Sequence, residues 1–170
     1  MKSLVLSFIA DDKPGLVNLI SAAISEHQGN WSESSLSQLA GKFAGVVVVD
    51  VPAANLDSLT SALNNLKDQG IRVSCEVSDS EASTTEYETV TLDLVGHDKQ
   101  GIVRDISNTL SLLGINVASL ETELTPGSMS SELLFKAKGE LQVPKSVDLD
   151  SVQAALEEIA SDLMVDITFA

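Results

Sequence analysis

The chain has 170 residues and is 44% hydrophobic, which is enough for two small hydrophobic cores or one larger one. Its formal net charge of −15, with 10 Lys and Arg residues, argues against direct binding to DNA or RNA, because such binding depends on cations that neutralise phosphates. The single cysteine, Cys75, excludes an intramolecular disulfide, and we expect it to be a buried residue of a strand.

The first predicted elements are a strand and a helix. Residues 4–10 are mostly apolar, and although they resemble a short signal peptide they are in register with the internal residues 90–96. We therefore expect them to belong to the fold of a cytoplasmic protein. No apolar run approaches the roughly 20 residues of a membrane helix. Residues 16–27 repeat apolar side chains at helical spacing, with Pro14 expected at the first helical position and Gly29 expected to end the helix.

Two strands, a second helix and a last strand are predicted next. The run of four valines in the third strand is typical of a buried central strand. Asn55 is a predicted N-cap of the second helix and Gly70 is predicted to end it. These elements are predicted over residues 31–39, 43–51, 56–66 and 71–75.

The same elements are predicted a second time because the sequence repeats. When residues 12–31 are shifted by 86 onto residues 98–117, eight of twenty positions are identical, whereas roughly one match is expected by chance. A later block repeats at an offset of 93, which predicts seven inserted residues near Pro126 and Gly127 or within residues 144–147. The second set of elements is predicted over residues 87–94, 102–113, 116–123, 132–138, 148–161 and 164–169, with Asp148 as the N-cap of its second helix.

This order of elements predicts the fold class. Strand, helix, strand, strand, helix and strand, occurring twice, give an α+β protein of two ferredoxin-like βαββαβ domains. Each domain would be a four-stranded antiparallel sheet with both helices on one face. We expect domains over residues 1–77 and 87–170, joined by a polar linker over residues 78–86. Free edge strands could pair between copies or between chains, so we also expect a pseudo-two-fold arrangement and a homodimer.

Sequence motifs that mark an enzyme are absent. The chain has no H-E-x-x-H, G-x-S-x-G or P-loop pattern and no cluster of Cys and His residues for a metal. We therefore expect no catalytic residue, no metal and no cofactor. His27 lies on a helical stripe and is expected to be packed or at the surface, whereas His97 precedes a turn where it could face a ligand.

The two glycine turns are the candidate binding elements. Gly15 and Gly101 each precede a predicted helix, whose free N–H groups and positive dipole end can receive a carboxylate. Asn30 and Asn116 open the following strands with an amide that both donates and accepts, as an α-amino acid requires.

A purely structural alternative is left open by these residues. Asp12 and Asp98 would cap their helices, the glycines would allow close packing, and the two Asn residues would only form turns.

The residues of the two turns resemble those of ACT domains. The segment Asp12-Lys13-Pro14-Gly15-Leu16-Val17, followed by Asn30 and by Gly41-Lys42-Phe43, resembles one such domain, and Asp98-Lys99-Gln100-Gly101-Ile102-Val103 with Asn116 resembles a second. The length and tandem arrangement are similar to the bacterial glycine cleavage system transcriptional repressor family. The resemblance implies a regulatory protein that binds an amino acid, with glycine the first candidate, at an interface between two domains. The ligand-binding residues that it implies are Asp11, Asp12, Gly15, Leu16, Asn30, His97, Asp98, Gly101, Ile102 and Asn116.

We therefore expect an amino-acid-responsive regulator that acts through a protein partner rather than by direct DNA binding, since the charge is −15 and no helix-turn-helix pattern is present. The alternative is a ligand-free protein–protein interaction module of ACT type, whose acidic helices dock a basic surface. An enzyme has the least support, because nothing assembles a nucleophile with a base or a metal.

Overall fold

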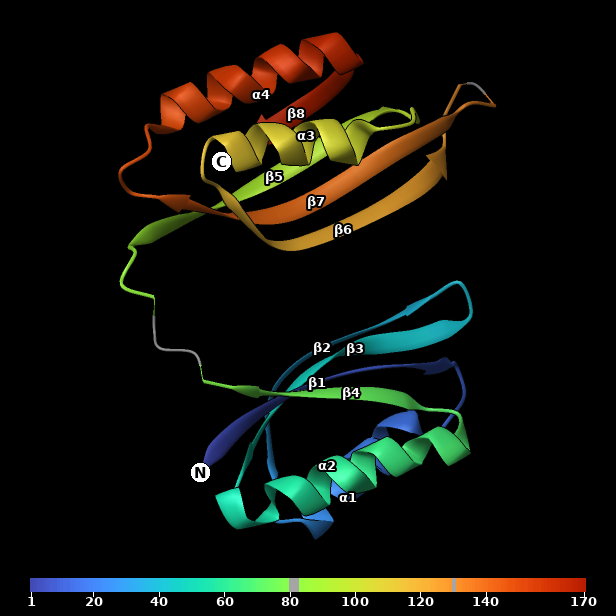
Figure 1. The fold of residues 1–170 in the computed structure, drawn as a ribbon. Coiled ribbons are helices and arrows are strands. Elements are labelled where there is room, and N and C mark those ends of the chain that lie inside the picture. The colour runs from blue at the N-terminus through green and yellow to red at the C-terminus, as the bar shows by residue number, and fades with distance from the viewer. Residues whose placement is uncertain (80–82, 130) are drawn as a thin grey trace. The chain divides into compact units, whose positions relative to one another are not determined.

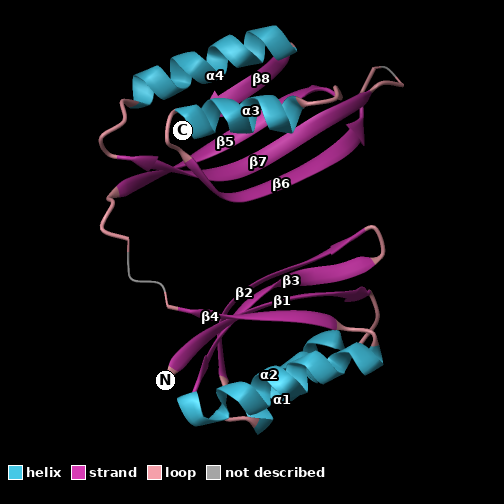
Figure 2. Cartoon of the chain, viewed as in Figure 1, coloured by secondary structure: helices cyan, strands magenta, loops and turns pink. Residues whose placement is uncertain are grey.

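Each half of the computed structural model is a four-stranded antiparallel sheet with two helices on one face, as predicted (Figure 1, Figure 2). The structure describes residues 1–79, 83–129 and 131–170. The chain divides into two compact units, Met1–Glu81 (unit 1) and Ala82–Ala170 (unit 2). Part of the linker expected over residues 78–86, namely residues 80–82, lies outside the described residues.

Unit 1 follows the predicted order of strand, helix, strand, strand, helix and strand. Its elements are β1 (Lys2–Asp11), α1 (Leu16–Glu26), β2 (Asn30–Leu39), β3 (Lys42–Val51), α2 (Leu56–Asn65) and β4 (Arg72–Ser78), with the short 3-10 helices η1 (Ala53–Asn55) and η2 (Leu66–Gln69) flanking α2. The strands lie in the order β2-β3-β1-β4, so the valine-rich strand β3 is central, as predicted.

Unit 2 repeats this arrangement. Its elements are β5 (Tyr87–His97), α3 (Ile102–Leu112), β6 (Asn116–Pro126), β7 (Leu133–Pro144), α4 (Leu149–Leu163) and β8 (Val165–Phe169). The strands lie in the order β6-β7-β5-β8, which matches the order in unit 1 strand for strand. The sequence repeat therefore corresponds to a repeat of the fold.

The strand registers locate the inserted residues of unit 2. Asn30 lies opposite Asp50 in unit 1, and Asn116 lies opposite Gln142 in unit 2. The sequence offset between the two copies is thus 86 between β2 and β6, and 92 between β3 and β7. Six of the seven extra residues belong to the β6–β7 hairpin, at the first of the two predicted places.

The core of each unit lies between its helices and its sheet. Leu4, Leu6 and Phe8 alternate along β1 and are buried against α1 and α2, where the helical stripe includes Leu59 and Leu63. Burial of such side chains is the main favourable term in folding. These positions follow the period of two in the strand and the helical spacing in α2 on which the sequence prediction rested.

Cys75 is half-buried on β4 rather than fully buried as predicted, and it packs against the core of unit 1. Burial raises the pKa of its thiol, so the reactive thiolate is disfavoured.

Two predictions about the ends of α1 are wrong. The helix begins at Leu16 after Gly15, which has the left-handed φ of 94°, so Pro14 lies in the preceding turn. The left-handed residue after the helix is Gln28, with φ 59°, rather than Gly29. Gly29 is needed for close packing, because a Cβ there would lie 2.8 Å from Cγ2 of Ile24.

The two predicted N-caps behave differently. Asp148 caps α4, since its Oδ1 accepts from the backbone N–H of Asp150 at 3.3 Å and its Oδ2 accepts from Oγ of Ser151 at 2.9 Å. Asn55 occupies the N-cap position of α2, but its Nδ2 donates to the carbonyl of His27 at 2.9 Å. Asn55 therefore ties the start of α2 to the end of α1 instead of capping its own helix.

The residue that ends α4 is poorly suited to its backbone conformation. Met164 has φ 57°, whereas Gly70 holds the corresponding position of unit 1 with φ 83°. Because left-handed conformations strain residues other than glycine, Met164→Gly is expected to raise the free energy of unfolding of unit 2 by about 0.5–1 kcal/mol. Urea denaturation followed by circular dichroism measures this change. Gly70→Met is the matched control and should lower the stability of unit 1, and a loss of stability in Met164→Gly would contradict the prediction.

Candidate functional site

The turn between β1 and α1 is held against the β2–β3 hairpin. The backbone N–H of Asp12 donates to the carbonyl of Gly41 at 2.9 Å, and Nε2 of Gln38 donates to Oδ2 of Asp12 at 2.8 Å. Asp12 is therefore not a helix cap, and no described side chain caps α1. No described atom lies within 4 Å of the place where a Cβ of Gly15 would be, so the surface at the start of the helix is open.

The corresponding turn of unit 2 is similar but more crowded. Gly101 has φ 92°, and among the described residues no side chain caps α3, so Asp98 is not a cap either. The backbone N–H of Asp98 donates to the carbonyl of Leu133 at 3.0 Å. Nη2 of Arg104 lies 3.0 Å from the Cβ position of Gly101, and Nε of Arg104 donates to Asp105 at 3.0 Å. Arg104, which the sequence analysis did not single out, places a cation beside this helix N-terminus.

Leu16 and Ile102 follow the two glycines and belong to the cores. Each side chain is 2% exposed. A ligand at the turn can therefore meet these two predicted contacts only through their backbone N–H groups, which lie in the first helical turn.

Asn30 lies at the opposite end of the sheet from the turn of unit 1. Asp11 pairs with Lys42, and Asn30 pairs with Asp50, eight residues further along β3. At about 3.3 Å per residue, the two ends are roughly 26 Å apart. One copy of unit 1 therefore does not bring its glycine turn and its Asn30 together.

Unit 2 separates its predicted residues in the same way. His97 pairs with Leu134, whereas Asn116 pairs with Gln142 and donates from Nδ2 to Oε1 of that residue at 2.9 Å. His97 lies at the turn with its side chain exposed, and its Nδ1 is 3.0 Å from Oε2 of Glu132. His97 is thus near the turn, as expected, and it faces a carboxylate of the β6–β7 hairpin. His27, by contrast, is half-buried, with Nδ1 2.7 Å from the carbonyl oxygen of Ala23.

The charge on Asp11 is set by its neighbours. Its carboxylate forms a hydrogen-bonded ion pair with Nζ of Lys42, and both side chains are largely exposed. This hydrogen bond and the positive charge of Lys42 lower the pKa of Asp11, with smaller contributions from Lys13 and Arg72. Lys42 belongs to the segment Gly41-Lys42-Phe43 that carries part of the ACT resemblance, but its place in the sequence did not indicate that it lies at the turn.

The effect of Lys42 on the pKa of Asp11 can be tested by removing the cation. Lys42→Met is expected to raise the pKa of Asp11 towards the usual value for aspartate, which an NMR titration of its side-chain carboxyl carbon measures. Because the folded-state pKa is lowered, the stabilisation that the pair gives is present above the unfolded pKa. It is lost as the pH falls through the folded pKa. Lys2→Met, which removes an ion pair with Asp79, is the control and should leave Asp11 unchanged.

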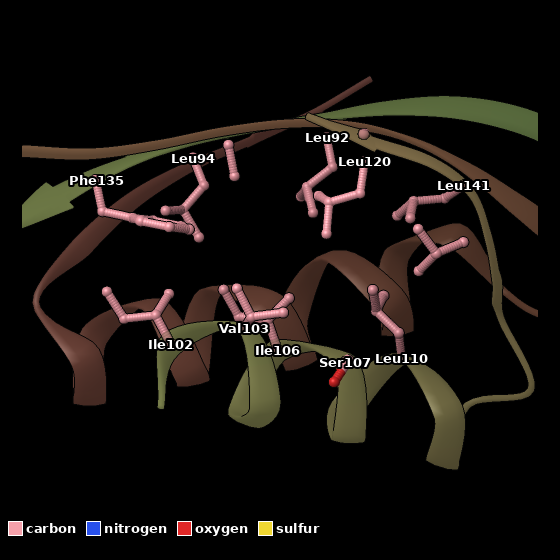
Figure 3. Close-up of a pocket in the computed structure, with 13 residues that line it drawn as sticks. Leu92, Leu94, Ile102, Val103, Ile106, Ser107, Leu110, Leu120, Phe135 and Leu141 are labelled. Carbon is pink, nitrogen blue, oxygen red and sulfur yellow. The ribbon is translucent and has the colours of Figure 1, made fainter. Parts of the chain in front are cut away.

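Unit 2 contains an apolar cavity of about 40 Å³ between α3 and the sheet. In Figure 3, leucines of β5 and β7 point towards the helix, and isoleucine and leucine side chains of α3 point back at them. Ser107 is the single polar side chain in the lining, so the cavity offers little to a zwitterion. Its labelled lining residues are Leu92, Leu94, Ile102, Val103, Ile106, Ser107, Leu110, Leu120, Phe135 and Leu141.

The two registers explain why space is left there. Leu6 lies opposite Val47 in unit 1, whereas its equivalent Leu92 lies opposite Gly139 in unit 2. Val47 is fully buried, so its replacement by glycine removes core volume at this place. We therefore interpret the cavity as a packing difference between the copies and not as the amino-acid site.

Within residues 1–79, 83–129 and 131–170, no group of three or more His, Cys, Asp or Glu side chains is placed to hold a metal ion. In the same ranges, no helix has both the length and the apolar character needed to cross a membrane.

Comparisons with known proteins agree with the geometry. Residues 2–83 match the family model described as ACT domain. A solved structure of a protein from Galdieria sulphuraria, described only as unknown, is 28% identical over 99% of this chain and 96% of that chain, with a TM-score of 0.87. A protein proposed as a glycine cleavage system transcriptional repressor is 19% identical over 99% of this chain and 96% of that one, with a TM-score of 0.71, which shows a shared fold. No curated protein matches the chain. Unit 1 is therefore an ACT domain, and unit 2 repeats its fold.

Proposed function

We propose that this chain is an amino-acid-responsive regulatory protein that binds its ligand at the glycine turns and acts through a protein partner. The observation that carries the proposal is the pair of helix N-termini at Gly15 and Gly101, each preceded by a glycine with positive φ and neither capped by a described side chain. Free N–H groups and the positive end of a helix dipole suit a carboxylate.

The residues around the first turn also suit the ammonium group of an amino acid. Asp12 belongs to the turn that leads into Gly15, and among the described contacts its carboxylate accepts one hydrogen bond, from Gln38. A carboxylate oxygen can accept more than one hydrogen bond, so Asp12 can receive an ammonium group while the helix receives the carboxylate. Glycine is the first candidate, because the structural relative proposed as a repressor is described as one of the glycine cleavage system.

The distance between the glycine turn and Asn30 determines where we place the ligand. Asn30 lies about 26 Å from the turn of its own unit, measured along β3 at about 3.3 Å per residue. A ligand that contacts both a turn and an asparagine must therefore receive the asparagine from another unit or another chain. We place the ligand at such an interface and propose that the protein is a homodimer in the cytoplasm.

The net charge supports a protein partner rather than DNA. A charge of −15 opposes binding to a polyanion. A mobility-shift assay with operator DNA should therefore show no complex with the purified protein alone, and tight binding would contradict this part of the proposal.

A melting screen against the twenty amino acids tests the ligand. At about 100 times Kd, a true ligand is expected to stabilise the protein by about 2.7 kcal/mol, which is a visible shift in melting temperature. Asn30→Ala and Asn116→Ala are the informative variants. If only one variant loses the shift in melting temperature, the ligand binds at the site that contains that asparagine. Equal loss in both variants would indicate a symmetric pair of sites.

Controls for this screen come from the same residue type. Asn64→Ala and Asn108→Ala remove exposed asparagines from α2 and α3, away from the strands that carry Asn30 and Asn116, and should leave the shift intact. A shift that survives in both strand variants would contradict the asparagine contacts. Absence of any shift in melting temperature would contradict the proposal that the protein binds an amino acid.

The second candidate function is a ligand-free interaction module, and α4 carries an observation in its favour. Asp150, Glu157, Glu158 and Asp162 are all exposed on this helix. Such a surface suits a basic partner. A protein that binds a basic partner with unchanged affinity in the presence of every amino acid would favour this alternative.

A further inference from the structure

Positive charge gathers at one end of the sheet of unit 1, although the chain as a whole is acidic. Lys42, Lys67 and Arg72 line one pocket of about 300 Å³, which we call the basic pocket. Lys13 adds a fourth cation at its edge, since its Nζ donates to the carbonyl of Gln69 at 3.3 Å, next to a residue of the lining. Four of the five Lys and Arg residues of unit 1 are therefore found here.

One acidic side chain belongs to the lining of the basic pocket. Asp11 is paired with Lys42, which leaves Lys67 and Arg72 without an acid in the lining. Lys42, Lys13 and Arg72 all lower the pKa of Asp11, which agrees with their positions at this end of the sheet. The pocket therefore keeps a net positive charge after the one ion pair is formed.

The fold does not require these cations, as unit 2 shows. Lys42 lies opposite Asp11 in unit 1, whereas Leu134 lies opposite His97 at the same point of unit 2. Arg72 lies opposite Ile9, whereas the equivalent residue of unit 2, opposite Val95, is Asp166. One cation is replaced by a leucine and another by an acid, so the basic pocket is a property of unit 1.

The alternative explanation is that the cations offset the dipole of the helix that ends here. Lys67 does lie in the last turn before Gly70, where a cation is favourable. Lys42 and Arg72 lie on β3 and β4, so the helix dipole does not account for them.

We propose that the basic pocket binds a small organic dianion, carrying either two carboxylates or a phosphate group. A guanidinium such as that of Arg72 pairs with carboxylate and phosphate through two parallel hydrogen bonds, and lysines add charge without fixing direction. Ile9 and Ala10 supply the apolar part of the lining, which suits a short carbon chain. The volume is at the low end for sites of small molecules. Asp11 is shared with the ligand-binding residues that the ACT resemblance implies, but the helix N-termini at Gly15 and Gly101 that carry the amino-acid proposal do not line this pocket, so each proposal can fail without the other.

The test is a calorimetric titration of the full-length protein with two probes, succinate and inorganic phosphate, at constant ionic strength. We expect saturable binding of at least one probe with one site per chain, and the tighter probe identifies the preferred anionic group. Lys67→Gln with Arg72→Gln is expected to weaken that binding by about tenfold or more, because two nearby charges are lost. Excess glycine should not displace the probe.

The control variant is Lys136→Gln with Lys138→Gln, which removes the same charge from β7 of unit 2. It should change the affinity by less than about twofold, since neither lysine lines the pocket and exposed charges are screened by salt. The amide NMR signals of Ile9, Ala10 and Gly70 should move as the native protein is titrated, which does not depend on any variant folding. Absence of saturable binding, equal weakening by the two double variants, or unmoved signals at these residues would overturn the proposal.

Discussion

Gly45→Ala is expected to lower the free energy of unfolding of unit 1 by about 3 kcal/mol, because β2 leaves no room for a side chain there. A Cβ on Gly45 would lie 2.3 Å from the carbonyl oxygen of Ser35 and 2.8 Å from Cα of Leu36. Both are backbone atoms of the neighbouring strand, so neither can rotate away. Urea denaturation followed by the fluorescence of Trp31, the single tryptophan of the chain, measures the stability of unit 1.

The matched control is Gly139→Ala in unit 2. Its Cβ would meet the carbonyl oxygen of Ser119 at 3.0 Å and Cδ1 of Leu120 at 3.6 Å, which a small local adjustment can accommodate. We expect a change of about 1 kcal/mol or less for this variant. Equal losses in the two variants would show that the contact to the β2 backbone is not the cause.

Leu6→Ala is expected to cost unit 1 about 2–5 kcal/mol, since it removes a fully buried side chain from the middle of the core. Leu6 lies on the central strand β1, between Val47 of β3 and Cys75 of β4. Truncation would leave a cavity bounded by strands on both sides, which the surroundings can fill only in part. The midpoint of the Trp31 transition should fall accordingly.

Leu92→Ala makes the equivalent change in unit 2 and tests whether each unit depends on its own core. It should lower the midpoint of the unfolding transition of unit 2 seen by circular dichroism. The midpoint of Trp31 fluorescence should not change, because Trp31 packs against the core of unit 1. A parallel fall of the Trp31 midpoint in Leu92→Ala would show that the two units unfold as one.

The fold was predictable because local patterns and the repeat agree with each other. Alternating apolar residues such as Leu4, Leu6 and Phe8 identify a strand regardless of what packs on it. The second copy then confirms each assignment independently. One error arises because a side chain bonds to a distant segment, since Asn55 donates to the carbonyl of His27 instead of capping its own helix.

The candidate site was less predictable, since its geometry depends on strand register. The sequence placed Gly15 at a helix N-terminus, but it could not show that Asn30 lies at the far end of the sheet. Nor could spacing indicate that Lys42, Lys67 and Arg72 meet in one pocket, because they come from a strand, a 3-10 helix and a second strand. Such clusters become visible only when the pairing of β1 with its two neighbours is known.

The space between α3 and its sheet has a consequence for how unit 2 responds to compression. Hydrostatic pressure favours the state of smaller volume, and apolar space that the folded chain leaves unfilled is lost when a protein unfolds. The space in unit 2 is only partly enclosed, so the expected effect is small. Where unit 1 has Val47, unit 2 has Gly139 and a cavity of about 40 Å³. Pressure should therefore unfold unit 2 before unit 1, so the two halves differ in their stability under pressure although they share one fold.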